Sequence, residues 1–343
     1  MFTGNKNNFI NMKTQDLRLI FLVVLLPIFA SVNARSWHIN NQSGISADFV
    51  DINAAMSSEN VVDGDTLYLG AGCVIGSQTL SKRVTLIGTG WRYNDSPVNP
   101  AKINGDITVT AAGARLLGVY VVGSCNIKAS NIVVERCYVG HEIRSQSYNL
   151  NNVKVLSCWT PYIGSAGYSS SGWEIRNNIV KGNYYPAIVR DFYNAVVENN
   201  IIINTYSGSS ILYNMDFCTI RNNIMLCGYS SGYTADCDNS FMQGNVLSAS
   251  PEYENLYPGN VLINSTDESL LFNCTGTVAS GEYYTLKEGS PAIGAGEGGA
   301  DCGVYGGVYR FVPYGRPDNV PVIKNLVVPS TPTDDSIDVT ISF

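Results

Sequence analysis

The sequence predicts an all-β fold, a parallel β-helix in which short strands stack into a solenoid. Two observations predict it: a phrase that recurs every 20 to 23 residues, and apolar runs of about 3–5 residues separated by Asn, Gly or Ser-Tyr turns. No helical periodicity is present between Val84 and Thr275. Because the same strand returns only after a whole unit, successive copies must stack in parallel. We expect roughly nine to ten rungs.

The recurring phrase ends in asparagine. Its clearest copies cover 174–179, 197–201, 219–224 and 241–246, and the equivalent residues are Asn178, Asn200, Asn223 and Asn245. Asn tolerates the left-handed backbone of a sharp bend, and its amide can bond to the same amide one rung above. We therefore predict a structural asparagine ladder, with Cys137 and Cys158 in the same column of earlier rungs.

The two ends of the chain differ from the repeat. Residues 1–34 have a basic start, an apolar run over 19–30 and a small-residue cleavage site, which is typical of a signal peptide. That run of about 12 residues is too short to cross a bilayer as a helix, which takes roughly 20. We expect an exported protein, periplasmic, cell-surface or extracellular, with no transmembrane segment after signal removal.

The mature chain divides into a solenoid over 35–310 and a Pro-rich tail over 311–343. A short amphipathic helix over 47–56, with Phe49, Ile52 and Met56 on one face, is expected to cap the first rung. The tail ends in one alternating strand at 337–343. That strand needs a partner edge, either on the solenoid or on another copy, so self-association is one alternative.

Composition narrows the classes of partner. The chain has 21 Lys+Arg against 28 Asp+Glu, a net charge of −7, which argues against binding to nucleic acid. The nine cysteines form no CxxC or Cys/His cluster, and the chain has two histidines, so we predict no metal or other cofactor. Calcium at Asp236 and Asp238 is the alternative, since alternating carboxylates on a strand point the same way. Most cysteines are expected to be buried in apolar surroundings.

Two stretches resemble a known family. Residues 63–72 and 80–88 resemble the opening rung of secreted right-handed parallel β-helix proteins of the pectate-lyase-like superfamily, and 290–296 with 301–307 resemble their closing motif. The pattern is also similar to secreted or surface β-helix proteins of Bacteroidetes. The resemblance implies an extracellular polysaccharide as partner. The Trp-Ile-Asp-His phrase of pectate lyases and the Asn-Thr-Asp and Arg-Ile-Lys phrases of polygalacturonases are absent, so it implies no specific reaction.

A glycan chain would lie in a groove along the solenoid and contact residues from successive rungs. Arg190, Tyr213 and Asp236 fall at steps of 23 and 23 residues, outside the asparagine ladder. The expected substrate-binding residues come from this face, from two rungs earlier and from the adjoining turn: Glu142, Arg144, Lys181, Tyr184, Tyr185 and Tyr213. Arginine can pair with a uronate carboxylate or sulfate, and tyrosines can stack on sugar faces.

The candidate catalytic residues are Arg190, Asp191 and Asp236. In a lyase, Arg190 or Lys181 would neutralise the uronate carboxylate while a tyrosine acts as acid or base. In a hydrolase, two carboxylates roughly 5–9.5 Å apart are needed, such as Asp191 with Asp236 or Asp236 with Asp238. Alternatively, Arg190 and Asp191 form a solvated surface pair, and the protein is a non-catalytic structural or adhesin-like surface protein.

Overall fold

The computed structural model describes residues 34–91, 100–165, 170–183, 187–206, 209–227, 234–235, 237–273, 283–316, 325–327 and 340–342. The segment that the sequence assigns to a signal peptide lies outside the described residues, except for Ala34. The chain divides into two units, Met1–Ala34 and Arg35–Phe343, and every element below belongs to the second.

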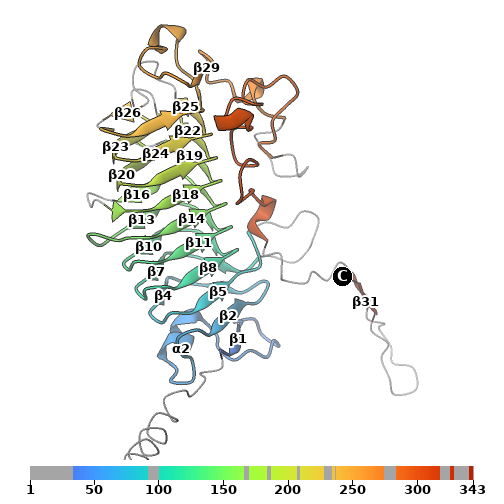
Figure 1. Ribbon diagram of the computed structural model, residues 1–343. Helices are drawn as coiled ribbons and strands as arrows, with labels where there is room; N and C mark the ends of the chain where they lie inside the picture. The colour runs from blue at the N-terminus through green and yellow to red at the C-terminus, as the bar shows by residue number, and fades with distance from the viewer. Residues whose placement is uncertain are drawn as a thin grey trace, which may run out of the picture. The chain divides into compact units, whose positions relative to one another are not determined.

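Three parallel sheets, which we call A, B and C, wind along a β-solenoid (Figure 1). Sheet A has ten strands: β1 (Ser36–Ile39), β2 (Thr66–Leu69), β5 (Thr85–Ile87), β8 (Arg115–Leu117), β11 (Val133–Glu135), β14 (Lys154–Leu156), β18 (Glu174–Arg176), β21 (Val196–Glu198), β24 (Thr219–Arg221) and β27 (Phe241–Gln243). Sheet B also has ten: β3 (Val74–Ile75), β6 (Lys102–Ile103), β9 (Tyr120–Val121), β12 (Tyr138–Val139), β15 (Trp159–Thr160), β19 (Ile179–Gly182), β22 (Ile201–Asn204), β25 (Ile224–Cys227), β28 (Val246–Leu247) and β29 (Val261–Leu262).

Sheet C has nine strands: β4 (Gln78–Leu80), β7 (Ile107–Val109), β10 (Cys125–Ile127), β13 (Ile143–Ser145), β16 (Ile163–Ser165), β17 (Ser170–Ser171), β20 (Val189–Tyr193), β23 (Leu212–Asp216) and β26 (Thr234–Ala235). The predicted parallel solenoid is confirmed. Turns that contribute to all three sheets are fewer than the nine to ten rungs expected. The reason is that β1 precedes the first full turn, whereas β27, β28 and β29 belong to incomplete last turns.

A short helix covers the start of the solenoid. Helix α2 (Ile52–Ser57) begins after Asp51, whose carboxylate accepts a hydrogen bond from the backbone N–H of Ala54 at 2.7 Å. Ile52 and Met56 are buried on its inner face, as expected. Phe49 precedes the helix and instead packs against Trp37, with ring centroids 5.5 Å apart.

The asparagine ladder is present in the core. The Oδ1 atom of Asn200 accepts from the backbone N–H and the Nδ2 of Asn178, at 2.8 and 3.0 Å, and the same pattern continues through Asn223 and Asn245 to Asn260. Cys158 precedes Asn178 in this column, as expected, because its N–H donates to Asn178 Oδ1. The bend itself is made by the preceding residue. Asn177, Asn199 and Asn222 have φ between 56° and 57°, so the prediction that the ladder asparagines adopt the left-handed backbone is wrong.

The cysteine prediction is confirmed for the thiols of the column and its neighbours. Cys125, Cys137 and Cys158 are fully buried among aliphatic side chains. The Cys158 thiol approaches backbone carbonyls, including that of Leu156 at 3.3 Å. These residues act as small core side chains.

Residues 283–316, which we call the C-terminal strap, lie along the outside of the solenoid rather than forming its last rungs (Figure 1). The coil ends with β29. The strap is held to successive turns by Asn222, which accepts from Glu297 N at 2.8 Å, by Asn177, which donates to Val304 O at 2.9 Å, and by Ser157, which donates to Tyr309 O at 2.6 Å. It buries the outer face of sheet B in a second apolar cluster that includes Ile201, Ile224, Val304 and Phe311.

The tail contains two short strands. β30 (Asn325–Val327) and β31 (Thr340–Ser342) pair antiparallel with each other. The last strand therefore has its partner within the tail, an arrangement that the sequence analysis did not consider. Within the described parts of the chain, no helix has the length and apolar character needed to span a membrane.

Candidate functional site

The second residues of the sheet C strands β10, β13, β16, β20 and β23 form one column on the side of the sheet away from the core. We call Asn126, Arg144, Gly164, Arg190 and Tyr213 the sheet C column, since they pair in this order from β10 to β23. Their neighbours along each strand, such as Ile143 and Val189, point inward and are buried. Because parallel strands lie ~4.8 Å apart, Arg144 and Arg190 are separated by ~9–10 Å along the column.

Arg190 has a defined orientation within the column. Its Nε donates to the Oδ2 of Asp191 at 2.6 Å, and its guanidinium lies over the Tyr213 ring, 5.4 Å from the centroid. Burial lowers the pKa of Arg190, but the hydrogen bond to Asp191 and nearby groups outweigh burial and raise it above its ordinary value. Arg190 is therefore a permanent cation, and its side chain is 22% exposed.

Asp191 is held inside a bend of β20. Its φ is 67°, and it is only 5% exposed. Its Oδ2 accepts from Arg190 and its Oδ1 accepts from the Nδ2 of Asn214 at 2.9 Å, and Asn214 makes the matching bend in β23 with φ 51°. Both carboxylate oxygens thus have partners within the protein, and Asp191 orients Arg190.

Asp236 lies outside the described residues. The residue that pairs with Tyr213 is Ala235, so the column continues one position earlier than the 23-residue step predicts. The proposed pairs of Asp236 with Asp191 or Asp238 therefore have no geometry among the described residues. In the part of the chain that the structure describes, no three His, Cys, Asp or Glu side chains gather as they would to hold a metal ion.

Arg144 repeats the arrangement of Arg190 two strands away. Its Nη1 lies 2.9 Å from the Oε1 of Glu142, and its Nε donates to the Oδ1 of Asn126 at 3.1 Å. The side chain is 30% exposed. Between the two arginines, Gly164 leaves room for close packing: a Cβ there would meet the Tyr162 hydroxyl at 2.7 Å and Arg190 Cγ at 3.0 Å.

Lys181 does not join the sheet C column, because it lies on β19 of sheet B. Its Nζ contacts the Oε1 of Glu268 at 2.6 Å and the hydroxyl of Tyr284, in the C-terminal strap, at 3.0 Å. The chain passes from sheet B to sheet C between β19 and β20, so Lys181 and Arg190 lie on different sheets although they are close in sequence. Tyr184 and Tyr185 of that turn lie outside the described residues.

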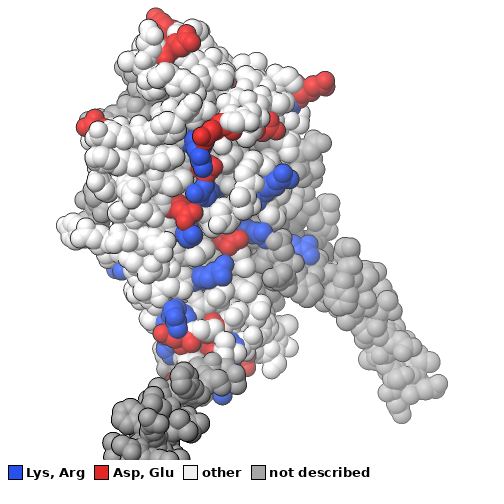
Figure 2. Space-filling view, viewed as in Figure 1, with Lys and Arg blue, Asp and Glu red and all other residues white. Residues whose placement is uncertain are grey.

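A second charged row lies on sheet A and was not foreseen. Figure 2 shows basic and acidic side chains alternating along one face of the molecule. Glu174 pairs with Lys154 at 2.6 Å and with Arg176 at 3.0 Å, while Glu198 contacts Arg176 and lies 3.1 Å from Arg221. These charges neutralise one another from turn to turn along sheet A.

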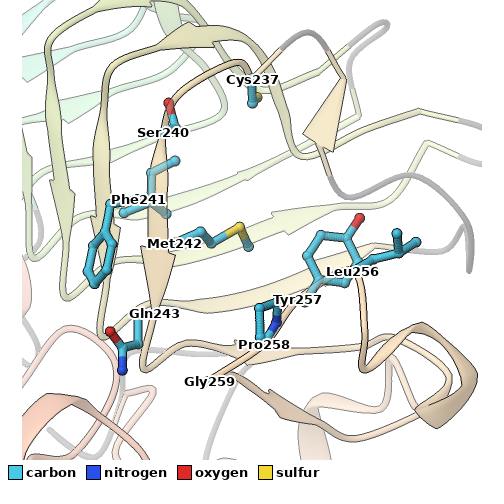
Figure 3. A pocket seen from close by; sticks show the side chains of 10 residues that line it. Cys237, Ser240, Phe241, Met242, Gln243, Leu256, Tyr257, Pro258 and Gly259 are labelled. Atoms are coloured by element: carbon cyan, nitrogen blue, oxygen red, sulfur yellow. The ribbon is translucent and has the colours of Figure 1, made fainter.

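A pocket of about 530 Å³ lies at the last turn of the solenoid (Figure 3). It is formed by β27 and the segment that follows β28, and Met242 points toward Tyr257 and Leu256. The described residues that line it include no charged side chain.

A smaller pocket of about 200 Å³ adjoins sheet C and contains Asn214 and Asp216. The sequence analysis missed this corner, although asparagines recur there two residues before strands of sheet A.

No known family model, curated protein or solved structure matches this chain.

Proposed function

We propose that the protein binds an extracellular polysaccharide through a groove along the solenoid, with the glycan lying along the sheet C column. The observation that carries the proposal is the register of Arg144, Gly164 and Arg190, which puts two cationic side chains at regular spacing on one face. Uronate carboxylates or sulfates can pair with such guanidinium groups. Tyr213 supplies an aromatic surface beside Arg190.

Recognition has more support than cleavage. Asp191 uses both carboxylate oxygens within the protein, and Arg190 is oriented by it. A polysaccharide lyase or glycoside hydrolase activity would need a further acid or base beside the column. Product analysis in the binding experiment tests this narrower alternative.

A structural or adhesin-like role without glycan binding is the second candidate. The observation that favours it is that each arginine of the column has its own carboxylate, Glu142 or Asp191. Such pairs resemble the self-neutralised row of sheet A. In that case the column would only hold the turns together.

The experiment measures binding of the purified protein to polygalacturonate, alginate, chondroitin sulfate and neutral galactan, with and without Ca²⁺. Unsaturated products would indicate a lyase, and new reducing ends alone a hydrolase. We expect retained binding to at least one acidic polysaccharide, weakened about tenfold or more by Arg144→Ala or Arg190→Ala, since a charge-assisted hydrogen bond contributes roughly 1.5–3 kcal/mol.

Arg83→Ala is the matched control, because Arg83 lies between β4 and β5, several turns before Arg144 and Arg190, and forms an exposed pair with Asp63, 3.9 Å away. It should bind like wild type. Equal binding by wild type and both column variants would contradict the proposal, as would the absence of binding to every polysaccharide.

We further propose that the solenoid is right-handed, belongs to the pectate-lyase-like superfamily and acts outside the cytoplasm. Support comes from the resemblance of 63–72 and 290–296 to that family, from the signal-like composition of 1–34, and from the strong preference of parallel crossovers for the right-handed sense. Detection of the protein in periplasmic, surface or secreted fractions of the producing cells tests the location.

A further inference from the structure

One corner of the solenoid repeats a left-handed backbone position. The positive-φ residues there each lie two positions before a strand of sheet A, and from β8 to β27 they are Gly113, Asn131, Asn152, Gly172, Asn194, Phe217 and Asn239. Backbone hydrogen bonds join neighbouring turns at this position: Asn194 N donates to Asp216 O at 2.9 Å, and Phe217 N donates to Asp238 O at 3.1 Å. This corner therefore requires positive φ in turn after turn.

Phe217 departs from the pattern. Glycine and asparagine tolerate positive φ, whereas a bulky residue with φ 54° is a genuine outlier and stores strain. Burial does not compensate for this strain, because Phe217 is 51% exposed. Its ring packs on Tyr193, with centroids 5.2 Å apart, and Tyr193 is itself 47% exposed. The chain thus keeps a strained aromatic pair at the surface.

Tyr193 of this pair lines the pocket of about 200 Å³ at the edge of sheet C, and Phe217 packs against Tyr193. Asn151, Ser171, Tyr193 and Asp216 are register partners on successive turns and line it. Amide, hydroxyl and carboxylate groups that donate and accept hydrogen bonds therefore gather beside the exposed rings. Asn214 connects the pocket to the sheet C column, because it lines the pocket and donates to Asp191.

We infer that this corner pocket binds one uncharged pyranose ring of the glycan, with the ring's apolar face on Phe217 and Tyr193. The sugar hydroxyls bond to Asn151, Ser171 and Asp216. The inference rests on the proposed polysaccharide binding and adds a subsite to it. The arginines of the sheet C column contact anionic groups of the glycan, and the corner pocket binds a neutral sugar next to them. Both rings are about half exposed and therefore accessible to a ligand.

The test is Phe217→Asn, which installs the residue type of the neighbouring turns. The probe is whichever of polygalacturonate, alginate, chondroitin sulfate or galactan the wild type retains. We expect the denaturation midpoint to rise, because strain is relieved, while binding weakens about threefold to tenfold. Tyr193→Ala should weaken binding to a similar extent. This loss should persist at high salt, because contact with a neutral sugar is not screened.

Unchanged binding by Phe217→Asn and Tyr193→Ala, with binding still reduced by Arg190→Ala, would overturn the corner subsite and leave the proposed function standing. A lower denaturation midpoint for Phe217→Asn would show that the ring is there for stability, which also overturns the inference. If the wild type binds none of the probes, the proposed function fails and the subsite fails with it.

Discussion

Asn199 and Asn200 are adjacent in sequence and have different structural roles. Asn199 turns the chain with φ 56° and faces the C-terminal strap, whereas Asn200 is fully buried and bonds to Asn178 and Asn223 in the ladder. The same division recurs at Asn222 and Asn223. One dipeptide therefore serves both the bend of the solenoid and its polar core.

Replacement of Asn200 by alanine should destabilise the protein by about 2–4 kcal/mol. The change removes the acceptor of the Asn178 N–H and the donor to the carbonyl of Ile175, which leaves buried groups unsatisfied. Urea denaturation measures the loss. A change below about 0.5 kcal/mol would show that the ladder contributes little to stability.

The effect of substitutions at Asn199 on the free energy of unfolding should depend on its backbone conformation rather than on its burial. Asn199→Ala is expected to cost about 1–2 kcal/mol, because alanine is disfavoured in the left-handed region, while Asn199→Gly should cost less. The two variants are compared in the same denaturant. Equal losses would mean that the side-chain contacts of Asn199 with the strap, and not its φ, decide its effect.

The C-terminal strap should detach without unfolding the coil. Val304 is 1% exposed in the cluster on sheet B, so Val304→Asp should expose the strap to limited proteolysis while strand content by circular dichroism is retained. Val308, in the same strap and 90% exposed, supplies the control, and Val308→Asp should be cleaved like wild type. Identical cleavage of both variants would contradict this account of the strap.

The free energy of unfolding should decrease at alkaline pH because the Cys302 thiol is buried. Burial, and secondarily Asp301, raises the pKa of Cys302 from 9.0 to about 12. Between these values the unfolded thiol loses its proton while the folded one keeps it, so the unfolding free energy declines as pH rises from about 9 toward 12. Cys302→Ala should flatten part of this decline. Denaturation midpoints measured across that range would contradict the prediction if both proteins showed the same slope.

How far the sequence predicts the structure depends on distance along the chain. The repeat correctly aligns Arg190 with Tyr213, because both lie in strands one turn apart. It misplaces the next turn, since repeat length varies at the bends and Ala235 takes the position expected for Asp236. The bends at Asp191 and Asn214 could not be predicted from the sequence, because the residue type alone does not determine whether an Asp or Asn adopts the left-handed backbone.

The strap shows the other limit of sequence reasoning. Asn177 bonds to Val304 across 127 residues, and Lys181 bonds to Tyr284 across 103. Such contacts depend on where the coil ends and how the chain returns, which no local pattern encodes. From the sequence, Lys181 is therefore predicted to lie beside the residues of the sheet C column, although it lies on sheet B.

The most direct measurement of the central claim is the salt dependence of acidic-polysaccharide binding by the wild type and by the Arg144→Ala/Arg190→Ala double variant. The account predicts that wild-type binding weakens as salt increases and that the double variant loses most of both the affinity and the salt dependence. Binding by the double variant with wild-type affinity and salt dependence would contradict a glycan site on the sheet C column.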